Sequence, residues 1–162
     1  MRYRAVVITI SDKGSAGLRE DTSGPGIRKM LEKTYDVREV LIVPDEADVI
    51  AATMRAEIDE KGVDLVVTTG GTGVGPRDVT PEATRQVIEK DLPGFSEAMR
   101  MESFRITPFA LISRAVCGIR RQSIIINLPG SPKAAAECLS FIEAALPHAL
   151  EKVKGDPGEC AR

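Results

Sequence analysis

The chain of 162 residues, with 43% hydrophobic and 28% charged residues, has the size and composition of one globular domain. A net charge of −2 and the absence of Trp argue against a surface that binds nucleic acid or anionic lipid by charge or stacking. Three distant cysteines, one histidine and no long apolar run argue against a zinc site, a disulfide framework and a membrane span. We expect a cytoplasmic protein with free thiols, one domain over residues 1–154 and a frayed tail at 155–162.

The first half of the chain alternates apolar runs with amphipathic segments. The run YRAVVITIS is continuously apolar and rich in β-branched residues, which is typical of a strand buried on both faces. A polar loop, DKGSAGLREDTSGPG, follows, and Ser23 and Pro25 offer a cap and a first-turn proline for a helix. In the second helix we expect these residues to face inward: Val49, Ile50, Ala52, Thr53 and Ile58. The pattern predicts strands at 3–11, 37–43 and 63–70 and helices at 26–35 and 45–61.

The second half of the chain repeats this alternation. Helices are expected from Thr80 and over 94–106, and SIIINLPG predicts a fourth apolar strand at 123–130 with a hairpin partner near 115–120. Ser131 then begins a last amphipathic helix that reaches about Lys154. Apolar strands that alternate with helices predict an α/β fold, with an open, mainly parallel sheet and helices on both faces.

Small, polar or acidic residues follow each of the four predicted strands. In open parallel sheets, ligands bind in the crevice beyond the carboxyl ends of the strands. The four segments that leave the strands should therefore meet at one edge of the sheet and form a binding site. These segments are Ser11-Asp12, Pro44-Asp45-Glu46, Gly70 to Gly73 and Asn127 to Lys133.

The third of these segments belongs to a glycine-rich loop, TTGGTGVGPRDVTPEAT. Glycines let backbone N–H groups approach an anion closely, but a tight turn would need them as well. The loop matches neither the Walker A motif nor the dinucleotide fingerprint. The segments TPE (80–82) and SPK (131–133) each read as a helix start, which either binds an anion or only caps its helix.

Two carboxylates, Asp45 and Asp78, are the candidates for catalysis. Each could hold Mg²⁺ through one oxygen while water and phosphates complete the octahedron. Asp45 could instead cap the second helix, and Asp78 could close a turn. Lys13, Arg77 and Arg114 are either phosphate partners or solvated surface. His148 is the only histidine and lies outside the predicted site, which argues against a Ser-His-Asp or histidine–metal centre.

The glycine-rich loop TTGGTGVGPRDVTPEAT and the segment INLPGSPKA closely resemble the molybdopterin adenylyltransferase family. This family includes bacterial MogA and MoaB and the G domain of gephyrin. Further matching segments are SDKGSAGLREDTSGP, VPDE, LPGF and ISR, in order over about residues 3 to 150. The resemblance implies a three-layer αβα sandwich, a homotrimer (hexamers among MoaB-like members), and a molybdate-insertion enzyme as a further partner. It also implies transfer of AMP from ATP to the terminal phosphate of molybdopterin, with Mg²⁺ and release of pyrophosphate.

The resemblance assigns the family's two functional aspartates, which act in catalysis and metal binding, to Asp45 and Asp78. It assigns nucleotide and pterin binding to Gly70, Gly71, Thr72, Gly73, Ser113, Arg114, Asn127, Pro129, Gly130, Ser131 and Lys133. Because the attacking phosphate is already an anion, no general base is required. Two alternatives stay open: an inactive, MoaB-like pterin-binding scaffold, and a relative of the MoeA and CinA families, which the single short chain argues against.

Overall fold

The computed structural model describes residues 2–158, and its centre is one six-stranded sheet. Strands β2, β1, β3 and β6 run parallel, β5 is antiparallel to β6, and β4 is antiparallel to β5. The expected mainly parallel sheet is therefore confirmed, and the short edge strand β4 is an addition to it. In their order across the sheet, the strands are β2 (Asp36–Val43), β1 (Arg4–Ile10), β3 (Leu65–Thr69), β6 (Ser123–Leu128), β5 (Cys117–Arg120) and β4 (Lys90–Asp91).

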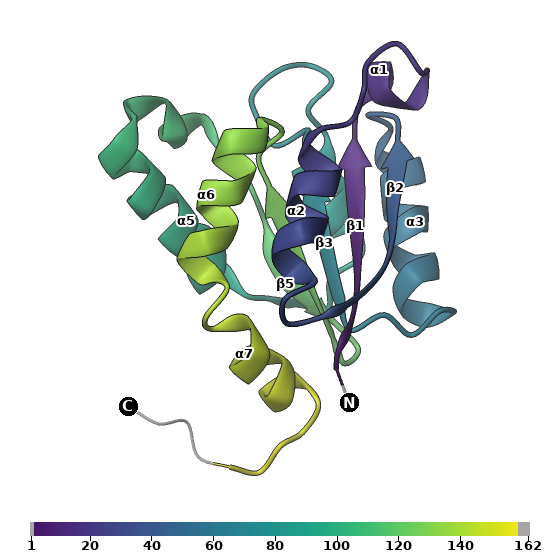
Figure 1. Ribbon diagram of the computed structural model, residues 1–162, viewed down its shortest axis with the longest axis vertical. Coiled ribbons are helices and arrows are strands. Elements are labelled where there is room, and N and C mark those ends of the chain that lie inside the picture. Colours follow the sequence, from purple (N-terminus) through teal and green to yellow (C-terminus); the bar gives the residue numbers. More distant parts are fainter. Residues whose placement is uncertain (1, 159–162) are drawn as a thin grey trace.

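Helices cover both faces of the sheet, as expected for a three-layer sandwich (Figure 1). Helices α2, α5, α6 and α7 pack on one face, and α3 and α4 pack on the other. The helices are α1 (Asp12–Ser15), α2 (Ser23–Leu31), α3 (Ala47–Asp59), α4 (Thr80–Arg85), α5 (Pro93–Ile106), the 3₁₀ helix η1 (Pro108–Ile112), α6 (Pro132–Ile142) and α7 (Leu146–Val153).

The two hydrophobic cores explain why the strands are apolar without interruption. Successive side chains of a strand point to opposite faces, so Ala5 and Val7 of β1 enter the core under α2 and α6, while Val6 and Ile8 enter the core under α3. All four are completely buried. Each fully buried aliphatic side chain stabilises the fold by about 1.5–3 kcal/mol, which fixes the strands and the positions at which they end.

The segment between β1 and α2 is more ordered than the loop that the sequence predicts. Ser11 Oγ accepts a hydrogen bond from Gly14 N (3.0 Å), which caps the one-turn helix α1. Helix α2 begins at Ser23, three residues earlier than expected, and Asp21 Oδ1 accepts from Gly24 N (2.9 Å) at its start. The predicted cap at Ser23 was wrong because Asp21 takes that role from outside the helix.

Helix α3 begins at Ala47, two residues after the predicted start. Its buried stripe is centred on Ile50, Met54 and Ile58, at a spacing of four residues. This leaves Val49 41% exposed and Ala52 exposed, so the prediction that these two face inward was wrong.

The predicted last helix is two helices, α6 and α7, with a break between them. Pro147 lies in the first turn of α7, where its missing N–H costs nothing, whereas it could not continue α6. Within residues 2–158, no helix is long and apolar enough to cross a membrane. The predicted frayed tail is described only as far as Gly158, and Cys160 lies outside the described residues.

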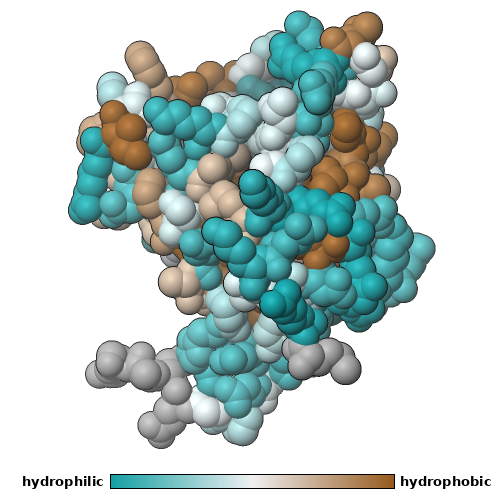
Figure 2. Space-filling view, viewed as in Figure 1, coloured by the Kyte–Doolittle hydropathy of each residue, from teal (hydrophilic) through white to brown (hydrophobic). Residues whose placement is uncertain are grey.

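Large apolar side chains are exposed mainly on α5 and η1. Figure 2 shows apolar residues on the side of the molecule where α5 lies in Figure 1. The exposed side chains on these two elements are Met101, Phe104, Ile106, Phe109, Leu111 and Ile112, which are 50–77% exposed. Exposed apolar side chains gathered on two neighbouring elements are typical of an interaction site.

Candidate functional site

The strand registers bring the four predicted segments to one edge of the sheet. Ile10 is level with Val43, Thr9 with Thr69, and Thr69 with Leu128. We call this end, at the top of Figure 1 beside α1, the carboxyl edge. The edge includes the loop of residues 70–79, which we call the glycine loop. The convergence predicted from the sequence is confirmed.

Gly70 and Gly71 make the sharp turn by which the chain leaves β3. Their φ angles are +108° and +66°, in the left-handed region that favours glycine. A Cβ on Gly70 would overlap the carbonyl oxygen of Ile10, and one on Gly71 would overlap Thr80 Oγ1 and lie 3.2 Å from Asp45 Oδ1. The two glycines are therefore required for the loop to lie directly against β1 and beside Asp45.

Thr80 fastens the far end of the glycine loop to its beginning. Its hydroxyl donates to Gly70 O (2.8 Å), and its backbone N donates to Gly71 O (3.1 Å). Val79, not Thr80, is the N-cap residue of α4. The alternative in which Thr80 only caps its helix was therefore wrong, because its side chain closes the loop instead.

Asp78 lies inside the glycine loop and closes a turn of it. Gly75 N donates to Asp78 Oδ2 (2.8 Å), and Asp78 N donates to Gly75 O (3.0 Å). Its other oxygen, Oδ1, accepts no hydrogen bond from any described residue. One oxygen thus holds the turn, as the alternative role for Asp78 predicts, and the second is available to a cation.

Asp45 is held by the exit of β1 and does not cap α3. Asp12 N donates to Asp45 Oδ2 (2.8 Å), and Asp45 N donates to Asp12 Oδ1 (3.0 Å). The N-cap residue of α3 is Glu46, so the capping alternative was wrong. As in Asp78, Oδ1 accepts no hydrogen bond from the part of the chain that the structure describes.

The pKa of Asp45 is raised above its ordinary value. Burial is the main cause, and the negative charges of Asp12 and Asp78 add to it, while the hydrogen bond from Asp12 N and the charge of Arg77 oppose it. The geometry of the glycine loop agrees: a Cβ on Gly71 would lie 3.2 Å from Asp45 Oδ1, and a Cβ on Gly73 would lie 2.8 Å from Asp78 Oδ2. The structure therefore brings Asp45 and Asp78 to the same region of the carboxyl edge.

Two cavities adjoin at this region. One, of about 460 Å³, contains Asp78 and has an apolar wall that includes Phe109 and Ile112. The other, of about 410 Å³, contains Asp45 and a polar wall from the segment between α1 and α2. Gly71 and Gly130 line both. Nearly all the predicted binding positions line one or both cavities: Gly70, Gly71, Thr72, Gly73, Ser113, Asn127, Pro129, Gly130 and Ser131.

Arg114 is a predicted binding residue that the structure shows holding the glycine loop. Its Nε donates to Gly73 O (2.7 Å), its Nη2 donates to Asp78 O (2.7 Å), and its guanidinium pairs with Glu82. Its backbone N also donates to Thr72 O (2.9 Å). Arg114 therefore supports the loop from behind and does not line either cavity.

Asn127 and Lys133 differ sharply in their surroundings. Asn127 is completely buried; its amide donates to Thr68 Oγ1 (3.1 Å) and Thr84 Oγ1 (3.0 Å), and its Oδ1 accepts from Val116 N (3.1 Å). These bonds tie β3, β6 and α4 together at the carboxyl edge. Lys133, by contrast, has a side chain 83% exposed and lies outside both cavities.

The sequence interpretation missed the role of Asp12. Asp12 pairs with Arg77 (3.0 Å), which also pairs with Glu46 (2.8 Å), so Arg77 is neither free surface nor a free phosphate ligand in this structure. Lys13 is exposed. The sequence offers one indication of a role for Asp12, namely its position. Asp12 closely follows β1 and belongs to one of the four segments expected at the edge of the sheet.

The remaining nucleophile candidates lie away from the carboxyl edge or are inert. Cys117 and Cys138 are buried free thiols, and burial raises the pKa of Cys117 to about 12. His148, on α7, is about half exposed beside Glu151 (3.5 Å). Burial therefore disfavours the thiolate forms of Cys117 and Cys138, and neither is expected to act as a nucleophile near neutral pH.

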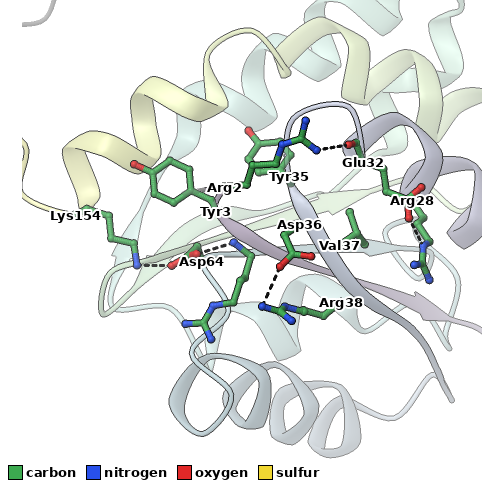
Figure 3. A pocket seen from close by; sticks show the side chains of 11 residues that line it. Arg2, Tyr3, Arg28, Glu32, Tyr35, Asp36, Val37, Arg38, Asp64 and Lys154 are labelled. Carbon is green, nitrogen blue, oxygen red and sulfur yellow. Dashed lines mark hydrogen bonds and ion pairs between the residues drawn. The ribbon is translucent and has the colours of Figure 1, made fainter.

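A larger cavity, of about 940 Å³, lies at the opposite edge of the sheet (Figure 3). Its lining carries five basic side chains, but three of its bases pair with its three acids. Arg28 pairs with Glu32 (2.6 Å), Arg38 with Asp36 (2.9 Å), and Lys154 with Asp64. Most of the charged side chains of this cavity are paired with one another. The cavity therefore offers fewer free groups to a ligand than the carboxyl edge does.

The sheet and its carboxyl edge define the class of protein: a three-layer α/β sandwich with a glycine loop and paired carboxylates beyond its parallel strands. Comparison with known proteins identifies the family. The family model described as "Probable molybdopterin binding domain" matches residues 6–148. The chain belongs to this family, as its sequence motifs predicted.

Individual relatives agree with this assignment. The chain is 46% identical to a molybdopterin adenylyltransferase of Helicobacter pylori, covering 93% of this chain and 87% of that protein. It is also 46% identical to the molybdenum cofactor synthesis protein cinnamon of Drosophila melanogaster, of which it spans only 25%. The crystal structure of the molybdopterin biosynthesis enzyme MoaB of Thermus thermophilus superposes with a TM-score of 0.90, at 45% identity, covering 97% of this chain and 99% of that one.

Replacing Gly71 with Ala should destabilise the protein by about 1–3 kcal/mol, the cost of holding a non-glycine residue in a left-handed conformation. Gly26 is the matched control, because a Cβ there meets nothing within 4 Å. Gly26→Ala, at an exposed position of helix α2, should instead stabilise by about 0.4–1 kcal/mol. Urea unfolding of the three proteins measures both effects; equal stability of Gly71→Ala and wild type would contradict the required turn.

Asp45→Asn should make the metal-free protein more stable at pH 7. Because the pKa of Asp45 is raised on folding, the folded state keeps its proton longer than the unfolded chain does, and stability falls as pH rises from about 3.9 through the raised pKa. The advantage of Asp45→Asn should therefore vanish below about pH 3.

Thermal unfolding in EDTA at several pH values tests this expectation. Asp59→Asn is the control of opposite sign, because the hydrogen bond from Arg120 lowers the pKa of Asp59. Removal of the Asp59 carboxylate should lower the free energy of unfolding at neutral pH. A wild type that is more stable than Asp45→Asn at pH 7 would contradict the unfavourable burial of this carboxylate.

Proposed function

We propose that this protein is a molybdopterin adenylyltransferase that transfers AMP from Mg-ATP to molybdopterin, in molybdenum cofactor biosynthesis. One observation carries the proposal: Asp45 and Asp78 each keep one carboxylate oxygen free of hydrogen bonds where two cavities meet under the glycine loop. The names of the relatives support the same reaction, with ATP and molybdopterin as the substrates.

The reaction needs positioning more than proton transfer. An oxygen of the terminal phosphate of molybdopterin attacks the α-phosphorus of ATP; the new P–O bond forms as the bond to the β-phosphate oxygen breaks, and pyrophosphate leaves. The nucleophile is already ionised, so no base has to accept a proton. Holding the two phosphates in line and neutralising their charge are the main requirements, and two adjoining cavities offer a separate place for each substrate.

The free oxygens fit Mg²⁺. Asp45 Oδ1 and Asp78 Oδ1 would hold the ion, which supplies charge neutralisation for the leaving pyrophosphate. Within residues 2–158 there is no cluster of three or more His, Cys, Asp or Glu that could hold a metal without help. Mg²⁺ is commonly held by one or two carboxylates together with substrate phosphates and water, and the pair Asp45 and Asp78 matches that arrangement.

We assign substrate binding to the lining of the two cavities. The backbone N–H groups of Gly71, Thr72 and Gly73 donate to no described residue, and these groups and the N-terminus of α6, capped by Ser131, favour phosphates. The apolar wall with Phe109 and Ile112 suits a planar ring system, and the polar wall beside Asp45 suits a phosphate or ribose. The proposed binding residues are Gly70, Gly71, Thr72, Gly73, Ser113, Arg114, Asn127, Pro129, Gly130, Ser131 and Lys133. Of these, Arg114 and Lys133 lie outside the lining, and we propose that Arg114 acts by supporting the glycine loop.

The proposal also includes the extent of the domain, its location in the cell, its partner enzyme and its oligomeric state. We propose one functional domain over residues 1–154, a cytoplasmic location, and a molybdate-insertion enzyme as the consumer of adenylated molybdopterin. We also propose a homotrimer, in which the apolar patch of α5 and η1 forms the contact between copies. The patch supports this because Phe109 and Leu111 are 77% and 68% exposed, which a solitary chain would not be expected to tolerate.

Asp45→Asn and Asp78→Asn should each reduce adenylyl transfer by at least about a hundredfold, the loss typical of removing one electrostatic stabiliser. Asp36→Asn is the control, because Asp36 pairs with Arg38 at the opposite edge and should leave the rate unchanged. Formation of adenylated molybdopterin from Mg-ATP is measured directly. Full activity in both site variants would refute their roles, and molybdopterin binding without any ATP turnover in the wild type would identify an inactive binding homologue.

Phe109→Asp should dissociate the trimer, because it places a charge at the most exposed of the apolar side chains on α5 and η1. Leu18→Asp is the control, since Leu18 is also exposed (79%) but lies outside α5 and η1. Sedimentation velocity compares the two variants with the wild type. A monomeric wild type, or a trimer that persists in Phe109→Asp, would rule out this patch as the contact.

A further inference from the structure

Arg77 joins three segments of the carboxyl edge that are distant in the sequence. It lies in the glycine loop directly before Asp78, and it contacts residues at the exits of β1 and β2. Its Nε and Nη2 donate to the two carboxylate oxygens of Asp12 (both 3.0 Å), and Nη2 also donates to Glu46 (2.8 Å). Arg77 therefore ties the loop that carries Asp78 to the segment that carries Asp45.

Asp12 completes this connection. Its backbone N donates to Asp45 Oδ2 (2.8 Å), while its Oδ1 accepts from Asp45 N (3.0 Å) as well as from Arg77. Both carboxylate oxygens of Asp12 are thus engaged, in contrast to the free Oδ1 of Asp45. Asp12 is placed to orient Asp45 and not to bind a cation itself.

We infer that Arg77 and Asp12 are positioning residues that fix the spacing between the carboxylates of Asp45 and Asp78. The inference rests on the proposed function, because that spacing matters only if the two carboxylates share a metal–nucleotide ligand. Groups that orient metal ligands from behind typically change metal affinity or activity by about 10–100-fold when they are removed.

Because the side chains of this connection are exposed, their effect on the position of the carboxylates can be measured separately from their effect on stability. The side chains of Arg77, Asp12 and Glu46 are 55%, 43% and 55% exposed, and exposed ion pairs contribute little to global stability. Arg77→Gln should therefore leave the unfolding transition unchanged while the two carboxylates lose their fixed separation. A two-point contact on Asp12 also predicts that Lys, with its single ammonium group, restores only part of the effect.

The direct test measures metal binding without turnover. Mn²⁺ replaces Mg²⁺, α,β-methylene-ATP replaces ATP, and electron paramagnetic resonance counts free Mn²⁺ in titrations of the full chain. Arg77→Gln should weaken Mn²⁺ binding about tenfold, Arg77→Lys less, and Arg28→Gln not at all. Arg28 is the control because it also forms a bonded pair with a carboxylate, Glu32 (2.6 Å), but at the opposite edge.

A double-mutant cycle tests whether Asp12 and Arg77 act together. If they form one connection, Asp12→Asn combined with Arg77→Gln should weaken Mn²⁺ binding little more than either change alone. Kinetics should agree: the Mg²⁺ concentration for half-maximal adenylyl transfer rises about tenfold in Arg77→Gln, while the rate at saturating Mg²⁺ stays within about threefold of wild type.

Three outcomes are decisive. If Arg77→Gln binds Mn²⁺ as the wild type does, the positioning role is refuted. If its rate at saturating Mg²⁺ collapses while the Mg²⁺ dependence is unchanged, Arg77 contacts the reacting phosphates and the inference is wrong. If the wild type itself neither binds Mn²⁺ with the nucleotide analogue nor transfers AMP, the proposed function fails first, and the inference fails with it.

Discussion

The close contact between the start of the glycine loop and the end of β1 is the constraint on which the site depends. Gly70 passes so near the carbonyl of Ile10 that no side chain fits between them, and a Cβ on Gly71 would overlap Thr80 Oγ1 and lie 3.2 Å from Asp45 Oδ1. This contact turns the loop back over the sheet instead of away from it. Asp78 is then carried to the region that Asp45 already occupies, and the two cavities share Gly71 as a common wall.

The position of Asp45 beside this contact is electrostatically unfavourable. Asp45 is partly buried near two other carboxylates, and its raised pKa shows that ionisation is disfavoured there. A protein selected for stability alone would not keep such a group. The two hydrophobic cores on either face of the sheet stabilise the fold and offset the unfavourable burial of Asp45. A divalent cation would remove the repulsion between Asp45 and the neighbouring carboxylates. Unfavourable charge in the free protein is thus the counterpart of favourable cation binding.

The sequence predicted the strands better than the details of the site. Strands such as β1 and β6 are buried on both faces, so their apolar runs are visible without knowledge of their neighbours. Helix starts depend on partners: Asp21 caps α2 from outside, and Asp45 turns towards Asp12 instead of capping α3. The support that Arg114 gives to Gly73, 41 residues away, has no local signal. Motif resemblance identified the positions, but only the fold separates residues that line the cavities from those that hold the lining in place.

The pairing of the two arginines nearest the glycine loop decides how an anion enters this site. Arg77 is occupied by Asp12 and Glu46, and Arg114 by Glu82 and loop carbonyls. Neither guanidinium is free to attract a polyphosphate, while Asp45 and Asp78 each line a cavity and keep one oxygen without a hydrogen bond from a described residue. Arg19 and Arg100 line the cavities and form no ion pair with a described carboxylate, so the repulsion that a metal-free nucleotide would meet is confined to the surroundings of Asp45 and Asp78. The proposed enzyme should therefore take up its nucleotide as the magnesium complex, with the cation satisfying the carboxylates and the phosphates in the same step.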